Sequence, residues 1–117
     1  MGFVHVNVGI SNPSDPYNAE EVRVLVDTGA TLSVFPTSVL DKMGIRRISQ
    51  RRFRGFGGVV TRDVGNINMH YGGVIAGVTA VFGDESDPAI MGVTALETLG
   101  YHVSPVDGEL YRVDMLL

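Results

Sequence analysis

The stretch Val22-Arg23-Val24-Leu25-Val26-Asp27-Thr28-Gly29-Ala30 decides the interpretation of this chain. Its first five residues are rich in β-branched side chains and predict a buried strand, and a second apolar strand, Leu32 to Phe35, follows. A carboxylate at the end of a core strand is costly to desolvate unless donors surround it. We expect Thr28 to supply a hydroxyl and backbone amides, and Gly29 to adopt positive φ and approach the acid. This suits a carboxylate fixed at the floor of a cleft for proton transfer; the alternative is an ordinary turn between strands.

Length and composition indicate a single globular domain over residues 1–117. Hydrophobic residues make up 44% and charged residues 19%, and 15 glycines and 5 prolines separate short apolar runs. This composition is typical of β structure with many tight turns. The chain has no cysteine and only three scattered histidines, so we expect no disulfide, no metal site and no cofactor.

The net charge of −4 argues against nucleic acid as a partner. Five of the nine basic residues nevertheless lie close together in the sequence: Arg46, Arg47, Arg51, Arg52 and Arg54. They form either a basic edge that attracts an acidic substrate or a solvated hairpin face, and strand alternation favours the second interpretation. We find no secretory signal and no apolar run of membrane-spanning length, and so expect a soluble cytoplasmic protein without membrane contact.

The remaining pattern predicts short strands separated by turns, with two short helices after Pro36 and Gly92. Residues 11–19 are expected to form a loop, and Gly65 to interrupt the strand from Val59 to Tyr71. The last strands, Tyr101–Ser104 and Leu110–Met115, are expected to form a hairpin. Residues 38–45 and 94–101 are faintly alike, which suggests two half-length units with one helix each.

Three motifs occur in order along the chain. Leu25–Ala30 matches a catalytic loop, Gly55-Phe56-Gly57-Gly58-Val59-Val60 is similar to a flap, and Ile90-Met91-Gly92 resembles a segment that threads beneath the catalytic loop. Together they resemble the retropepsin-like aspartic proteases, which include retroviral proteases and small stand-alone cellular relatives. The resemblance covers nearly the whole chain and implies an all-β fold, a small closed β-barrel of the acid-protease type with two short helices, forming a homodimer.

The chain departs from the retroviral pattern at one pair of segments. Thr31 follows the Asp-Thr-Gly-Ala run where many retroviral enzymes have Asp, and Val93-Thr94 replaces Arg-Asp or Arg-Asn. The Arg–Asp salt bridge that supports the viral dimer is therefore missing. The stand-alone cellular members are the nearer comparison.

Aspartic protease chemistry needs two carboxylates that share one proton. The chain has only one Asp-Thr-Gly, and Asp63, Asp84, Asp87 and Asp107 lack a comparable strand-to-turn context. The second carboxylate is therefore expected from a second copy, with both Asp27 side chains at a two-fold axis. An extended peptide or protein substrate would then lie between flap and catalytic loop.

The resemblance also implies roles for the residues around Asp27. Gly55, Gly57 and Gly58 would let the flap open and close, while Phe56 would cover the peptide and its amide would help hold a bridging water. Ala30 and Ile90 would line side-chain pockets, with Met91 and Gly92 as structural support. The alternative for the flap is a plain flexible hairpin.

We therefore predict an aspartic endopeptidase with catalytic Asp27 and active-site loop Thr28, Gly29 and Ala30. The alternative is a catalytically weak peptide-binding or dimerisation module that retains the fold. A third possibility, a β-barrel domain with a coincidental Asp-Thr-Gly, leaves the other two motifs unexplained.

Overall fold

A computed structural model describes residues 3–55 and 57–117 of the chain. Nine strands and two short helices are present in this part, so the predicted all-β class is confirmed. In chain order they are β1 (His5–Asn12), β2 (Asp15–Val26), β3 (Ser33–Pro36), α1 (Thr37–Lys42), β4 (Ser49–Gly55), β5 (Gly58–Tyr71), β6 (Val74–Gly83), β7 (Ile90–Met91), α2 (Val93–Leu99), β8 (Tyr101–Val103) and β9 (Leu110–Arg112).

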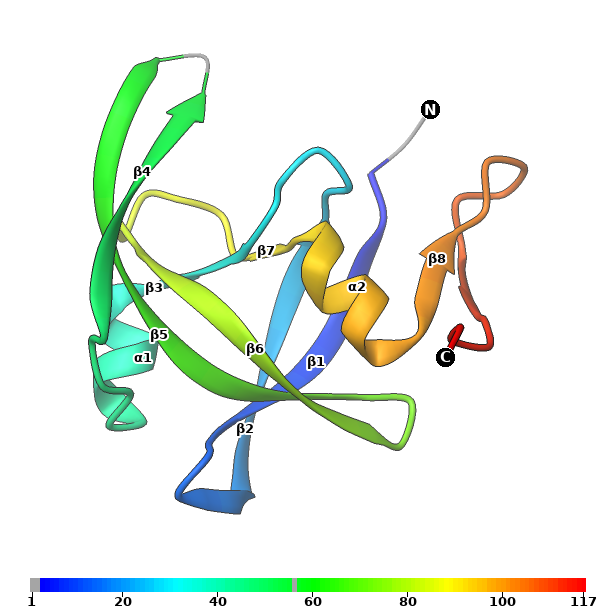
Figure 1. Cartoon of the computed structure of the whole chain (residues 1–117), viewed down its shortest axis with the longest axis horizontal. Coiled ribbons are helices and arrows are strands. Elements are labelled where there is room, and N and C mark those ends of the chain that lie inside the picture. The colour runs from blue at the N-terminus through cyan, green and yellow to red at the C-terminus, as the bar shows by residue number, and fades with distance from the viewer. Residues whose placement is uncertain (1–2, 56) are drawn as a thin grey trace.

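Seven of these strands form one sheet in the order β1-β2-β7-β3-β6-β5-β4. β1 also pairs with β5 through residues 9–11, so the hydrogen-bonded order returns from β5 to β1. β4 lies outside this ring of pairings and forms a hairpin with β5 alone. In Figure 1 this hairpin rises at the upper left, while the separate β8–β9 hairpin lies at the right beside α2.

β7 lies between β2 and β3, the two strands that flank Asp27, and pairs with both. It pairs in parallel with β2, Leu25 opposite Ile90 and Val26 opposite Met91. On its other side Ile90 pairs antiparallel with Val34 of β3. β7, which follows Asp27 by more than 60 residues in the sequence, therefore fixes the spacing between β2 and β3, the strands before and after the Asp27 loop.

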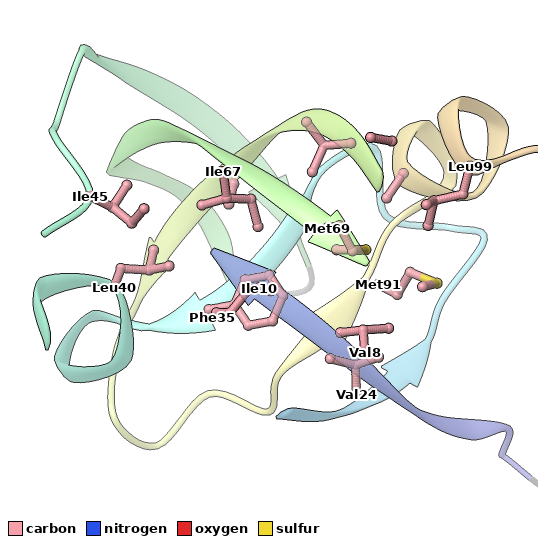
Figure 2. Close-up of a cluster of buried hydrophobic side chains, with 14 of the residues drawn as sticks. Val8, Ile10, Val24, Phe35, Leu40, Ile45, Ile67, Met69, Met91 and Leu99 are labelled. Carbon is pink, nitrogen blue, oxygen red and sulfur yellow. The ribbon is translucent and has the colours of Figure 1, made fainter. Parts of the chain in front are cut away.

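The core fills the space enclosed by the sheet and beneath both helices (Figure 2). Because side chains alternate along a strand, Val8 and Ile10 of β1 are buried while Asn7 is exposed. β2 behaves in the same way: Val24 is fully buried and Arg23 is exposed, so this strand buries one face only. Other fully buried side chains are Phe35, Leu40, Ile67, Met69 and Met91.

Two predictions about chain breaks are wrong. Residues 11–19 are not a loop, because β1 and β2 continue to a tight turn at residues 13–14. The Asn12 side chain holds this turn by accepting hydrogen bonds from Ser14 and donating to the carbonyl oxygens of Met43 and Gly44. Gly65 does not interrupt β5. A Cβ there would come within 2.5 Å of the Arg46 carbonyl oxygen, so this glycine permits close packing.

The two helices end in the same way, in agreement with the faint repeat. Gly44 follows α1 with φ of 71° and Gly100 follows α2 with φ of 83°, both in the left-handed region that favours glycine. The C-terminal hairpin forms as predicted, although β8 and β9 are only three residues each. No helix in the described residues is long and apolar enough to span a membrane.

Candidate active site

Asp27 is the first residue after β2, in the loop that joins β2 to β3. Its backbone N–H donates to the Met91 carbonyl of β7 at 3.0 Å, which ties the loop to the central strand. Its carboxylate oxygen Oδ1 accepts a hydrogen bond from the Gly29 N–H at 2.9 Å. The Ala30 N–H donates to the Asp27 carbonyl at 3.2 Å and closes the turn. The carboxylate is therefore held within its own loop and remains partly exposed.

The structure corrects two expectations about this loop. Gly29 is not among the glycines with positive φ in the described residues; its backbone nevertheless approaches the acid as expected. A Cβ on Gly29 would lie 3.2 Å from Asp27 Oδ1, tighter than an ordinary contact. Thr28 is exposed, and within the described part of the chain its hydroxyl makes no hydrogen bond to Asp27.

Gly92 fits tightly beneath the loop, as the third residue of the predicted supporting segment. A Cβ there would meet the carbonyl carbon and oxygen of Leu32 at 2.6 Å and the Ala30 carbonyl oxygen at 2.9 Å. Its N–H donates to the hydroxyl of buried Ser33 at 3.0 Å. Only a residue without a side chain allows this approach, so close packing explains the glycine.

A second link joins the loop to α2 at the position of the missing salt bridge. The Thr94 hydroxyl and N–H both donate to the Thr31 carbonyl, at 2.7 and 3.2 Å. The Val93 N–H donates to the Ala30 carbonyl at 2.8 Å. Neutral hydrogen bonds thus connect the two segments that lack the ion pair.

A groove of about 640 Å³ lies between the Asp27 loop and the β4–β5 hairpin. Gly29, Ala30 and Ile90 line it on the loop side, and Gly55, Gly57 and Gly58 on the hairpin side. Gly58 is the hairpin glycine with positive φ, at 103°. Figure 1 shows the loop between β2 and β3 and the hairpin tip on the same side of the molecule. Phe56, predicted to cover the peptide, lies outside the described residues.

A second groove of about 500 Å³ lies on the other side of the loop. Thr28 lines it together with Phe3, Val93, Leu96 and Tyr101. Val26 and Thr28, on either side of Asp27, both line this second, largely apolar groove, whereas Gly29 and Ala30 line the groove on the hairpin side, which also contains several arginines.

The four other aspartates considered in the sequence are engaged elsewhere. Asp63 pairs with Arg47, and Asp84 with Arg62. Asp87 accepts a hydrogen bond from the Asp84 N–H at 2.9 Å, and Asp107 accepts one from the Tyr111 hydroxyl at 2.6 Å. Within residues 3–55 and 57–117, no group of three or more His, Cys, Asp or Glu side chains could hold a metal ion.

A family model described as "Aspartyl protease" matches residues 14–103, most of the chain. The chain belongs to the aspartyl protease family. Among solved structures it is similar to EIAV protease complexed with the inhibitor HBY-793, with a TM-score of 0.67. The sequences are 23% identical, and the match covers 86% of this chain and 90% of that one. Among curated proteins no sequence matches.

The family match and the retroviral-protease fold together confirm the predicted resemblance to retropepsin-like aspartic proteases. The structure of this aspartyl protease brings the predicted loop, Ile90, Met91 and Gly92 together, with the described glycines of the β4–β5 hairpin across the groove. The sequence interpretation missed Ser33 and the Thr31–Thr94 link. The five arginines of the basic segment are exposed, as the favoured interpretation of a solvated face expects, and Arg51, Arg52 and Arg54 also line the groove.

Proposed function

We propose that this aspartyl protease is an endopeptidase that hydrolyses peptide bonds with water activated by two Asp27 carboxylates, one from each subunit of a homodimer. The observation that carries the proposal is the position of Asp27. It is held by Gly29 and Met91, and its neighbours Gly29 and Ala30 line the groove beneath a glycine-tipped hairpin. A fixed, partly exposed carboxylate beside a groove meets the geometric requirement for proton transfer.

The proposed reaction divides two tasks between the carboxylates. The ionised one takes a proton from water, which attacks the peptide carbonyl carbon, while the protonated one donates to the carbonyl oxygen. Two carboxylates about 3 Å apart cannot both ionise, so they share one proton and titrate as a pair. In the collapse of the tetrahedral intermediate, the dyad donates the proton that it took from water to the amide nitrogen and takes back a hydroxyl proton. The C–N bond breaks, an amine and an acid are released, and the dyad again holds one proton.

The second carboxylate is proposed to come from a second copy of the chain. Asp63, Asp84, Asp87 and Asp107 each have a partner of their own, which supports this source. A two-fold axis beside Asp27 brings the same carboxylate from both subunits together and needs no further residue.

The apolar surface near the chain ends supports the same dimer. Phe3 is 83% exposed, Met115 63% and Leu116 99% in the single chain. Phe3 also lines the apolar groove that Thr28 lines. Exposed apolar side chains favour aggregation in a monomer, whereas in a dimer they can be buried in the interface.

We further propose that the β4–β5 hairpin is a flap over the substrate and that the main sheet is a closed barrel. The flap is supported by the groove beneath the hairpin and by positive φ at Gly58, which allows the tip its tight turn. In this arrangement Ala30 and Ile90 contact the side chains of the peptide. The barrel is supported by the β1–β5 pairing.

The test is cleavage of a randomised peptide library by the wild type and by Asp27→Asn, assayed at several pH values. The amide is nearly isosteric but cannot act as the base, so cleavage should fall by about 10³-fold while the dimer and its thermal stability are retained. Activity within tenfold of the wild type would refute the role of Asp27. Peptide binding without any cleavage by the wild type would instead favour a peptide-binding module.

A further inference from the structure

The groove beneath the hairpin is basic, although the whole chain is acidic. Arg51, Arg52, Arg54 and Arg62 line it, and Asp87 is its one carboxylate side chain among the described residues. The chain as a whole carries a net charge of −4. Positive charge is therefore concentrated at the site where a substrate would lie.

Strand register places two of these arginines on the same face of the hairpin. Arg51 of β4 lies directly opposite Arg62 of β5. Two residues nearer the tip, Phe53 lies opposite Val60 on the same face, and both line the groove. From the tip inward, this face presents glycines, then an apolar pair, then a pair of arginines.

Ion pairs neutralise only part of the positive charge of Arg51 and Arg62. Arg62 forms an ion pair with Asp84 at 3.0 Å. Arg51 is exposed and forms no ion pair with any described residue. Asp87 does not fill this gap, because it forms no ion pair with Arg51 among the described residues. Like charges directly opposite each other in a hairpin are destabilising, so the pair lacks a structural reason.

Arg47, in the same basic segment, is an arginine with a structural role, because its charge is paired within the chain. It donates to Asp41 at 2.8 Å and to Asp63 at 3.1 Å, and its guanidinium lies 4.3 Å from the centre of the Phe82 ring. Arg51 has none of these partners, and it faces the groove.

We propose that Arg51, assisted by Arg62, selects substrates that carry an acidic side chain. The carboxylate of a Glu or Asp residue near the scissile bond would pair with the Arg51 guanidinium, while its neighbours contact Phe53 and Val60. The inference rests on the proposed endopeptidase function and adds its substrate class. Guanidinium groups suit this role because they bind carboxylates with two parallel hydrogen bonds.

The test uses peptides that differ only by Glu, Gln or Lys at one position, chosen from the library peptides that Asp27→Asn binds. The wild type should cleave the Glu peptide with kcat/KM about twofold to fivefold above the Gln peptide, as expected for a partly exposed ion pair. In Arg51→Gln this ratio should fall to about one, and in Arg51→Glu the Lys peptide should become the best substrate. The matched control is Arg46→Gln, which removes the same charge from an exposed arginine outside the groove.

The preference should persist in Arg46→Gln and weaken in high salt. A Glu/Gln ratio of about one for the wild type at every position would overturn the inference, as would equal losses in Arg46→Gln and Arg51→Gln. Binding of the same peptides to Asp27→Asn, measured by calorimetry, separates this inference from the proposed function. A Glu preference in binding with no cleavage by the wild type would refute the protease alone, whereas cleavage without a preference would refute the substrate class alone.

Discussion

Replacement of Gly92 by alanine tests whether β7 holds the Asp27 loop in place. The backbone at Gly92 has φ of −84° and ψ of 173°, which any residue can adopt, so only contacts oppose the change. The new Cβ would lie 2.6 Å from the Leu32 carbonyl carbon and oxygen and 2.9 Å from the Ala30 carbonyl oxygen. All three are backbone atoms, which cannot rotate away. β7 or the catalytic loop must therefore move.

The size of the effect follows from these contacts. Overpacking of this kind costs about 1–3 kcal/mol of unfolding free energy. Alanine regains about 0.4–1 kcal/mol by restricting the unfolded chain. We expect a net loss of about 1–2 kcal/mol and a Tm lower by about 4–10 °C in a domain of this size. Because Met91, next to Gly92, binds the Asp27 N–H, a displaced β7 should also lower kcat by tenfold or more, about the cost of a sub-ångström misplacement.

The assay compares Gly92→Ala with Gly77→Ala at one fixed protein concentration, by urea unfolding and by peptide cleavage. Gly77 is exposed in β6, and a Cβ there would meet only Asn68 Oδ1 at 3.8 Å. Gly77→Ala should leave the unfolding free energy unchanged or raise it by up to about 1 kcal/mol, and it should leave kcat unchanged. If the unfolding free energies of the two variants agree within about 0.5 kcal/mol and their kcat values are equal, the explanation given for Gly92 is wrong.

Three further predictions concern the flap, the C-terminal hairpin and the dimer. Gly58→Val should slow turnover more than it lowers Tm, because valine is strained at φ of 103°. Gly73→Val is the control, because it introduces similar strain at φ of 80° in open space outside the groove and should leave turnover unchanged. The hydrogen bond from Tyr111 lowers the pKa of Asp107, so this contact stabilises the hairpin above the ordinary carboxyl pKa and is lost as pH falls through the lowered value. Tyr111→Phe should raise the Asp107 pKa in an NMR titration; no change would contradict this cause. Deletion of residues 115–117 should shift sedimentation towards monomer and reduce activity together, and a fully active monomer would refute the interface.

The sequence predicted the parts of the fold that depend on local pattern. Strand alternation located the strand before Asp27, and Gly44 and Gly100 ended both helices as expected, since each local rule acts within a few residues. The prediction of a loop at residues 11–19 was wrong because tertiary contacts, which the local sequence does not show, stabilise a hairpin there. The Asn12 side chain binds carbonyl oxygens after α1 and stabilises a tight hairpin turn.

The sequence indicated candidate residues for the site, which remain a prediction, but not the geometry in which they lie. The order of the three motifs identified Asp27 and Gly92, yet not that Gly29 approaches the carboxylate without positive φ. The Thr31–Thr94 link joins residues 63 positions apart, and nothing in either local sequence indicates it. The groove position of Arg51 depends on strand register, which composition does not reveal.

The most direct test of the central claim is a mixing experiment on the shared dyad. Wild type and Asp27→Asn chains are unfolded together in equal amounts, refolded, and assayed for peptide cleavage at a concentration where both are dimeric. If each active site needs both Asp27 carboxylates, only dimers of two wild-type chains are active, and activity should be about one quarter of that of the all-wild-type sample. An activity of about one half, proportional to the wild-type fraction, would show that each chain acts alone and would contradict the proposed mechanism.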